Sequence, residues 1–517
     1  MMKQKLSILL LLILLLQSLL TACGPAGANA PAVSATGETT AAPETTAAPA
    51  PAAEPIVLCE GGESPYRIVL STSANQYEKN AAELVQKHFE ARTGIRLPIV
   101  TDDEERIDTE IVVGNTKRDK YSGISVTRSV ASDALISEEN SYRLVASRQR
   151  IFLYCLGDKN RNSTNRGTVF AAYRFIEEAL RYSVVYDRAL SEIGDRVTVP
   201  GDLDVEASSH SLSGKHTVDY PGETVLYSLP QADTSTKTGA SVILKTADGK
   251  IMVIDGGYAG DLASITEAVK ALTPAGKTPT VDAWVITHLH DDHFNALLHY
   301  IDCIKKNKDV GGLAVKEIWS HILSDAWYEK NNLAEFVKRG NILKNPPAPM
   351  KYVDLAKDQI IPFGEAEIEV LYVGLENIRS NMNDTSVVLK VKANGRSMLL
   401  LADAENTISG MLMRKCTPEQ LKADAVQIGH HGTFNVQKEV YEAVGAAYYF
   451  WPITYVMWHC DDGTGLGAIN RQYGTYEAMA KTRQWLEELD VPEENLFLTF
   501  KGISVYRFAT GTAEYVS

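Results

Sequence analysis

Apolar and polar positions along the chain form two patterned regions. Before about residue 200, short alternating runs surround two stretches with apolar positions at helical spacing. They predict strands at 66–72, 110–114, 184–186 and 196–199, a hairpin at 141–156, and helices at 75–92 and 168–180. Strands mixed with two helices indicate a small α+β domain.

After about residue 220 the pattern changes to repeated strand–helix units, which indicate an α/β fold. It predicts strands at 223–229, 281–287, 315–322 and 446–453, two or three strands within 351–373, and hairpins at 240–255 and 386–403. It also predicts helices at 261–272, 407–415 and 470–489, and a closing strand pair formed by NLFLTF and GISVYRF.

The first 57 residues have no such pattern. Lys3 and Lys5 precede an apolar run at 6–20, and Leu-Thr-Ala-Cys ends at Cys23. This order is typical of a secretory signal, and its end resembles the lipobox of bacterial lipoproteins, which implies a lipid on Cys23. A membrane-spanning anchor is the alternative, but the run is short of the ~20 residues that a span needs. The Ala/Pro/Thr-rich stretch at 24–57 predicts a flexible tether.

These features predict a location at the cell membrane, lipid-anchored on the extracytoplasmic face, with a tether typical of Gram-positive surface lipoproteins. The net charge of −14 argues against tight, sequence-independent binding of nucleic acid, which needs a basic surface. The five cysteines after Cys23 are odd in number and irregularly spaced, so we expect buried apolar cysteines and no disulfide framework.

Residues 288–293 read HLHDDH and directly follow the apolar strand at 281–287. His288 and His290 are two positions apart in an extended stretch, so their rings can point the same way. Asp292 and His293 follow as the chain turns into a helix, and they can face a neighbouring point. Imidazole and carboxylate groups favour zinc and related metals, so we expect two divalent ions, zinc first, with manganese or iron as alternatives. A polar turn with solvated histidines is the competing interpretation.

This segment resembles the HxHxDH signature of the metallo-β-lactamase superfamily, and the resemblance covers about residues 220–510. It implies an α/β, αββα sandwich for residues 220–517. A linker at 201–219 would join that sandwich to the smaller α+β domain at 58–200.

Further positions match the same family. Asp255 ends a hairpin strand before two glycines, where the family has an aspartate that supports the metal loop. Asp403 follows an apolar LLL strand, where an aspartate bridges both metals. The His-His-Gly at 430–432 resembles the branch that contains the nuclease-like domain of competence proteins and the phosphorylcholine esterases. This likeness implies His430 as a ligand of the second metal and His431 as a pocket acid or ligand.

One departure concerns the first metal site. Many members of the superfamily have a further histidine between the HxHxDH loop and the bridging aspartate. Here that interval holds only His299 and His321, neither in a Gly-His context. The first site then has three protein ligands, or one metal binds weakly. A Gly-rich loop after residue 457, MWHCDDGTGLGAIN, either closes over the pocket or is a plain surface loop.

The α+β domain resembles the accessory domain that precedes the barrel in family 20 glycoside hydrolases and α-glucuronidases. The resemblance lies in ARTGIRLPIV, EIVVGN and NRGTVFAAYRFIEEALRYSVV. It implies a domain without catalytic residues and, by analogy, contact with cell-wall carbohydrate through residues 58–200. A spacer or packing domain is the alternative.

The leading hypothesis is therefore a surface-tethered, metal-dependent hydrolase of small or polymeric phosphodiesters. A metal-bound hydroxide would attack, Asp292 would orient it, and His431 would assist the leaving group. A lactonase or other carboxylic-ester hydrolase is the alternative within the enzyme class. A glycan-binding or cell-wall-binding lipoprotein with a vestigial metal site is the alternative outside it, and the intact ligand set argues against that.

Overall fold

The computed structural model describes most of the chain after residue 52. The described residues are 53–118, 141–156, 166–191, 196–207, 217–231, 237–377, 381–433, 436–469 and 475–516. Cys23, the signal segment and nearly all of the expected tether lie outside them. None of the described helices is long and apolar enough to cross a membrane. Residues Ala52–Ser517 form one compact unit.

The N-terminal part of this unit is built on a six-stranded mixed sheet with the order β10-β5-β6-β4-β2-β3. Its strands are β2 (Arg67–Leu70), β3 (Ile99–Thr101), β4 (Glu110–Val113), β5 (Tyr142–Ser147), β6 (Arg150–Cys155) and β10 (Asp204–Ala207). Two helices pack on it, α2 (Gln76–Thr93) and α3 (Arg166–Arg174), and α3 continues as a π-helical turn, η3 (Phe175–Ala179). Asn75 and Glu78 start α2 with a reciprocal capping box.

Two strands lie where the sequence pattern predicts unstructured chain. Strand β1 (Ile56–Glu60) begins within the range expected to be tether and pairs with β9 (Arg196–Val199). Strand β10 lies within the expected linker at 201–219 and forms the edge of the sheet beside β5. Both runs are too short to show a clear period by themselves, and pairing with a distant strand stabilises them. The strand predicted at 184–186 is instead part of the turn between two shorter strands, β7 (Tyr182–Ser183) and β8 (Arg188–Ala189), which pair as a ribbon.

The C-terminal part contains two further sheets. The eight-stranded sheet has the order β16-β15-β14-β13-β12-β11-β24-β25, and the seven-stranded sheet has the order β17-β18-β19-β20-β21-β22-β23. The first comprises β11 (Val225–Ser228), β12 (Ser241–Lys245), β13 (Ile251–Asp255), β14 (Thr280–Val285), β15 (Ala314–Ser320), β16 (Lys351–Asp354), β24 (Ser504–Arg507) and β25 (Thr512–Tyr515). The second comprises β17 (Ile360–Phe363), β18 (Ala366–Tyr372), β19 (Val388–Ala393), β20 (Arg396–Leu400), β21 (Ala425–Gln427), β22 (Tyr448–Trp451) and β23 (Leu496–Leu498).

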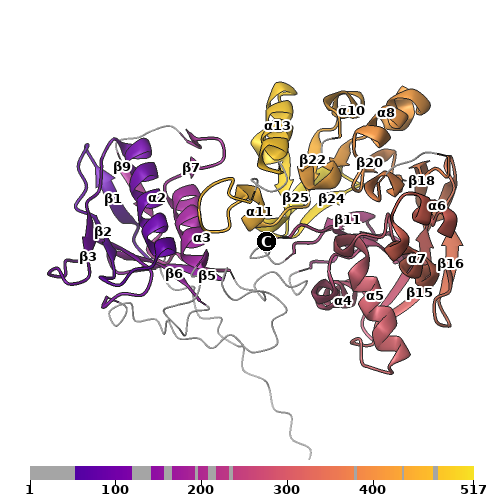
Figure 1. The fold of residues 1–517 in the computed structure, drawn as a ribbon, viewed down its shortest axis with the longest axis horizontal. Helices are drawn as coiled ribbons and strands as arrows, with labels where there is room; N and C mark the ends of the chain where they lie inside the picture. The colour runs from indigo at the N-terminus through magenta and orange to yellow at the C-terminus, as the bar shows by residue number, and fades with distance from the viewer. Residues whose placement is uncertain are drawn as a thin grey trace, which may run out of the picture. The chain divides into compact units, whose positions relative to one another are not determined.

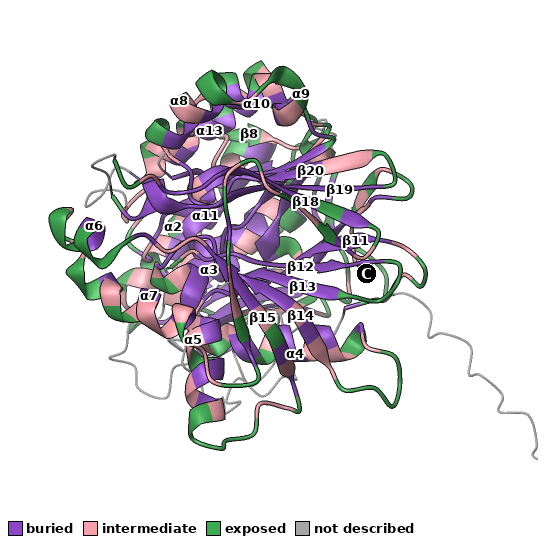
Figure 2. Ribbon diagram, turned by 90° about the vertical axis from the view of Figure 1, so that its right-hand side faces the viewer, coloured by how far each residue is buried: buried purple, intermediate pink, exposed green. Residues whose placement is uncertain are grey.

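These two sheets face each other, and helices cover their outer sides (Figure 1). An apolar layer that includes Met252, Val285, Leu389 and Phe450 fills the space between the sheets. The helices are α4 (Leu262–Ala271), α5 (Asp291–Lys305), α6 (Asp325–Lys330) and α7 (Val337–Lys344) on one side, and α8 (Asn406–Lys415), α9 (Pro418–Leu421), α10 (Lys438–Val444), α11 (Tyr455–His459) and α13 (Thr475–Glu488) on the other. Figure 2 shows the strands buried and the exposed surface concentrated on helices and loops. The architecture is the αββα sandwich that the sequence predicts.

The expectation of a closing strand pair was wrong. NLFLTF contributes β23 to the seven-stranded sheet, whereas GISVYRF contributes β24 to the eight-stranded sheet. A short 3-10 turn at Thr499–Lys501 carries the chain from one sheet to the other. Alternation of apolar residues shows that a segment is a strand but not which strand is its partner.

The cysteines match the expectation of buried apolar side chains. All five cysteines after Cys23 are free thiols, and four of them are buried, while Cys416 is partly exposed.

Candidate metal centre

The HLHDDH segment lies where a buried strand leads into a helix. Strand β14 is buried along most of its length, and α5 starts at Asp291 with His290 as its N-cap residue. His288 and His293 are buried, and His290 and Asp292 are partly exposed. Ligand sites in α/β folds form at such carboxyl ends of strands.

The remaining candidates come from the other sheet. Asp403 follows β20 closely and His431 follows β21, and each of these two side chains is 1% exposed. The site is therefore assembled from the ends of strands in both sheets, so its geometry depends on how the sheets pack together.

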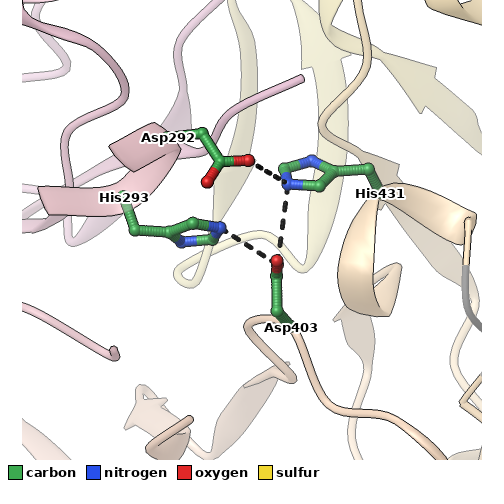
Figure 3. A group of neighbouring side chains, drawn as sticks. All are labelled: Asp292, His293, Asp403 and His431. Carbon is green, nitrogen blue, oxygen red and sulfur yellow. Dashed lines mark ion pairs between the residues drawn. The ribbon is translucent and has the colours of Figure 1, made fainter. Parts of the chain in front are cut away.

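Six side chains form two groups that share one carboxylate. Asp292, His293, Asp403 and His431 make the first group, and His288, His290 and Asp403 make the second. Within each group the ligand atoms lie within 4.8 Å of one another. Figure 3 shows the first group, with both aspartates and the two imidazoles pointing toward a common point.

Each oxygen of Asp403 faces a different group. Oδ1 lies 3.1 Å from His293 Nε2 and 3.6 Å from His431 Nε2. Oδ2 lies 3.8 Å from His288 Nε2, and that atom lies 3.1 Å from His290 Nδ1. Asp403 is therefore the residue that both groups would share in holding metal ions.

Hydrogen bonds on the far side of the rings fix which nitrogen is free. His293 Nδ1 donates to Asp255 Oδ2 at 2.7 Å, and His431 Nδ1 donates to the Pro452 carbonyl at 2.8 Å. In its neutral form, each of these imidazoles therefore presents an Nε2 lone pair to the group. The structure places Asp255 behind the metal loop, as its sequence position predicts.

The loop itself is held by the same aspartate. The Thr287 hydroxyl lies 2.8 Å from Asp255 Oδ2, and its proton is used in donating there. It must then accept from His288 Nδ1 at 3.2 Å, so the lone pair of this ring lies on Nε2, which faces His290 Nδ1 at 3.1 Å. Asp255 has a φ of 55°, a left-handed conformation that aims its carboxylate back at this loop.

The electrostatics of the pocket favour a cation. Burial alone would lower the pKa of His293, but three nearby carboxylates, Asp403 first among them, raise it well above its ordinary value. Burial disfavours the charged form of Asp403, yet the neighbouring imidazoles, led by His293, hold its pKa well below its ordinary value. The carboxylates thus stay negative and attract positive charge to the centre of the pocket.

The residues of the group that contains Asp292 and His431 fit a divalent metal ion. Among the described side chains, His293 Nε2, His431 Nε2 and Asp403 Oδ1 are buried and make no hydrogen bond, although they lie close together. Buried polar atoms without a partner are costly and need an explanation such as an ion. Nitrogen and carboxylate donors suit zinc, manganese or iron, and the donor set does not choose among them.

The two histidines of the His-His-Gly segment point in different directions. Both adopt left-handed backbone conformations in η8 (Gly429–Gly432), with φ 46° at His430 and φ 51° at His431. This turn sends the His431 ring to Oδ1 of Asp403. The structure thus places His431, not His430, beside Asp292 and His293, the residues that the sequence assigns to the second metal, so His431 is the better candidate ligand of that metal.

His430 lies on the other side of the bridging carboxylate. Its Nε2 is 3.6 Å from Asp403 Oδ2, and its Nδ1 is 3.1 Å from Glu405 Oε1. Glu405 also accepts hydrogen bonds from Asn383 at 2.6 Å and Asn381 at 3.0 Å. The sequence pattern does not single out Glu405, although its spacing from Asp403 in the segment DAE indicates that both side chains can face one site.

A second missed contribution comes from the insertion between β15 and β16. Arg339 donates to the Leu289 carbonyl at 2.7 Å and pairs with Asp291 at 2.6 Å. Its guanidinium lies 5.0 Å from the ring centre of Phe336, whose edge approaches His290 at 5.7 Å between centroids. These contacts fix the segment that carries His288 and His290. No motif in the irregular sequence around 331–345 indicates them.

Three other features lie apart from the two groups. His321 contacts the Leu355 carbonyl at 2.9 Å, and His299 lies 3.7 Å from Cys303 Sγ. Neither histidine therefore adds a ligand to the group of His288 and His290, which is the first metal site of the sequence prediction. The Gly-rich loop is not a plain surface loop: His459 and Asp461 are both fully buried.

Comparison with known proteins identifies the C-terminal part. Residues 236–444 match the family model described as Metallo-beta-lactamase superfamily. The chain contains a metallo-β-lactamase domain. Members of this superfamily are usually metal-dependent hydrolases, so a metal-dependent active site is the general expectation for this domain. No protein with a curated description matches the chain in sequence.

Solved structures similar to the chain include YhfI, a metallo-β-lactamase fold protein from Bacillus subtilis. It is 14% identical with a TM-score of 0.32, and the match covers 55% of this chain and 100% of that one. CmlA, a diiron β-hydroxylase from Streptomyces venezuelae, is 14% identical with a TM-score of 0.31, covering 54% of this chain and 53% of that one. A diphosphatase of the PhnP family is 16% identical with a TM-score of 0.24, covering 42% and 72%.

Proposed function

We propose that the metallo-β-lactamase domain hydrolyses phosphodiesters in a metal-dependent reaction. The observation that carries the proposal is the pair of ligand groups that share Asp403, because two adjacent divalent ions suit an in-line displacement at phosphorus. The likeness of the His-His-Gly segment to the phosphorylcholine-esterase branch supports the same substrate class. When bound, the ions would supply Lewis acidity and activate water.

Asp292 is the residue best placed to orient the attacking water. Its side chain is 18% exposed, the most of its group, so it reaches the solvent side of the pocket. Burial would raise its pKa, but His293 and His431 outweigh burial and lower it. The carboxylate is therefore charged at neutral pH and can accept a hydrogen bond from a water molecule.

His430 is placed to contact the substrate. Its side chain is 13% exposed, and Glu405 holds the Nδ1 side of the ring. Burial lowers its pKa, but Asp403 and Glu405 outweigh burial and raise it. A protonated ring in this position would donate a hydrogen bond to a phosphoryl or leaving-group oxygen. This role replaces the assistance that the sequence assigned to His431.

The test is hydrolysis of bis(p-nitrophenyl) phosphate by residues 52–517 loaded with zinc or manganese, with His290→Ala as the control. We expect turnover that depends on metal and disappears in the variant. If the metal-loaded protein cleaves no phosphodiester, the proposal is wrong. Parallel assays with a p-nitrophenyl ester and a lactone would then test the carboxylic-ester alternative.

We further propose that the chain is a lipoprotein anchored through Cys23 to the outer face of the cell membrane. The signal-like order of residues 1–23 and the Ala/Pro/Thr-rich stretch after it support this. Cys23→Ala should move the protein from the membrane fraction to the soluble or secreted fraction. Contact of residues 58–200 with cell-wall carbohydrate is a prediction that a pull-down on purified cell wall would test.

A further inference from the structure

The turn that carries both pocket histidines is strained. His430 has φ 46° and ψ 47°, and His431 has φ 51° and ψ 19°. Residues other than glycine seldom adopt this left-handed conformation, and they keep it only where surrounding contacts enforce it. The contacts that hold residues 429–432, called here the His-His turn, therefore decide where the His431 ring lies.

Three of the contacts that hold the His-His turn come from two elements. Trp451 Nε1 donates to the His431 carbonyl at 2.7 Å, and His431 Nδ1 donates to the Pro452 carbonyl at 2.8 Å. Thr482 Oγ1 donates to the Gly432 carbonyl at 3.1 Å. Gly432 also lies directly on the Trp451 indole, since a Cβ there would come within 2.2 Å of it. The turn thus rests on the segment from β22 into α11 and on α13.

The N-terminal domain binds the first of these elements, α11. Glu177 accepts hydrogen bonds from the Tyr455 hydroxyl and from His459 Nε2, both at 2.9 Å. The Tyr173 ring stacks on the His459 ring with centroids 4.3 Å apart, and its hydroxyl donates to Asp461 at 2.5 Å. His459 and Asp461 are fully buried in this contact. A charge-assisted hydrogen bond between buried groups is stronger than a neutral one.

The same domain reaches the second element, α13. The Arg483 side chain lies with its guanidinium 5.0 Å from the Trp458 ring centre and 5.9 Å from that of Tyr186. Cation–π contacts of this kind are stronger when buried, and Arg483 is 3% exposed. Trp458 in turn meets Trp451 edge-on at 5.3 Å, directly below the His-His turn.

We propose that the N-terminal domain braces the His-His turn and so positions His431, with Glu177 as the main positioning residue. Both of these elements are themselves held by residues of that domain, and the strain of the turn makes it sensitive to the loss of their contacts. This role is independent of which bond the metal centre cleaves. If the N-terminal domain served only as a spacer or bound carbohydrate, removal of its contacts with α11 would leave the His-His turn unchanged.

The experiment is hydrogen–deuterium exchange of the metal-free full chain, read by mass spectrometry. The amide of His430 donates to Ala402 and that of Thr433 to His430, so peptides covering 425–433 report the turn. In Glu177→Gln we expect exchange there, and in 452–461, to be about tenfold faster, while peptides from the N-terminal sheet keep their rates. Glu178→Gln is the matched control, because this neighbouring glutamate is 39% exposed and pairs with Arg174 on its own helix.

Unchanged exchange at 425–433 in Glu177→Gln would overturn the proposal, and so would an equal rise throughout the chain, which would indicate general loss of stability. Tyr173→Phe provides a second variant, since it removes the hydroxyl that binds Asp461 without changing charge. It must show the same local pattern with smaller amplitude. No metal or substrate is present, so this outcome is separate from the success or failure of phosphodiester hydrolysis.

Discussion

The Nε2 atom of His431 lies 3.6 Å from the Oδ1 atom of Asp403, and neither atom makes a hydrogen bond. The next residue back in the chain, His430, lies 3.6 Å from the other oxygen of the same carboxylate. Two adjacent histidines therefore approach one aspartate from opposite sides. Their roles should be separable by substitution.

His431→Ala should remove one of two bound metal equivalents, because it deletes a ligand from the group that holds Asp292 and His293. His430→Ala should keep both equivalents and lose activity, because His430 belongs to neither ligand group and its ring would contact the substrate. Metal content by inductively coupled plasma mass spectrometry checks the first result, and turnover of bis(p-nitrophenyl) phosphate checks the second. Loss of metal in His430→Ala with full retention in His431→Ala would reverse the assignment.

Asp255→Asn should weaken metal binding by about 10-fold to 100-fold without preventing folding. The amide keeps the shape of the side chain but loses the negative charge that accepts from His293 Nδ1 at 2.7 Å. Competition with a zinc chelator measures the affinity. Asp261→Asn is a suitable control, because its carboxylate contacts the Tyr258 amide and not a candidate ligand. Equal affinities in wild type and Asp255→Asn would contradict the orienting role.

Arg339→Ala should lower the metal affinity of the group that contains His288 and His290 by about tenfold. The metal affinity of the other group should stay the same. The substitution frees the Leu289 carbonyl, which now accepts a hydrogen bond from a charged group at 2.7 Å. Cobalt titration followed by absorption can resolve the two binding steps. Lys338→Ala, an exposed neighbour on the same helix, should change neither step. A uniform decrease in both steps would speak against a local effect.

Glu110→Gln should destabilise the N-terminal domain by about 3–5 kcal/mol at pH 7, because it removes the anion from a buried cluster. The Glu110 carboxylate is fully buried and lies 2.7 Å from Arg67, 3.2 Å from Arg118 and 3.4 Å from Arg150. Burial would raise its pKa, but the arginines, Arg67 foremost, lower it below the ordinary value of 4.5. A carboxyl group whose pKa is lower in the folded than in the unfolded state stabilises the folded state at pH values above its unfolded-state pKa.

That stability should disappear as the pH falls below about 4.5 and through the folded-state pKa, so wild type and variant should converge in acid. Urea unfolding between pH 7 and pH 3 measures the difference. Glu104→Gln is the comparison, since this glutamate is 53% exposed at 3.5 Å from Arg67 and its loss should have little effect. If the difference in unfolding free energy between wild type and Glu110→Gln stays constant with pH, the charge of Glu110 is not its cause.

The sequence predicted the architecture well where the signal is local. The strand at 281–287 and the turn into α5 follow from a continuous apolar run and an amphipathic helix, and both appear in the structure. The partner of each strand was less predictable. Strand β24 joins β11, far away in the chain, and the pattern of GISVYRF contains no information about that choice.

The candidate site shows the same division. His288, His290, Asp292 and His293 lie within six residues, so spacing alone indicates that they converge. The direction of the His431 ring depends on two left-handed residues in a row, which no sequence pattern specifies. Arg339 contacts the metal loop from α7, and Glu177 contacts α11 from the N-terminal domain. Each of these contacts joins segments that are far apart in the sequence, so no local pattern predicts it.

The position of β24 has a consequence for biosynthesis. Strand β24 lies between β11 and β25, so the eight-stranded sheet stays open until residues near 504–515 have been made. A ribosome adds only ~5–20 residues per second, so β11 must wait many seconds with an unpaired edge. We therefore expect the sandwich to close only once β24 has been made, with the nascent chain exposed to aggregation or dependent on chaperones until then.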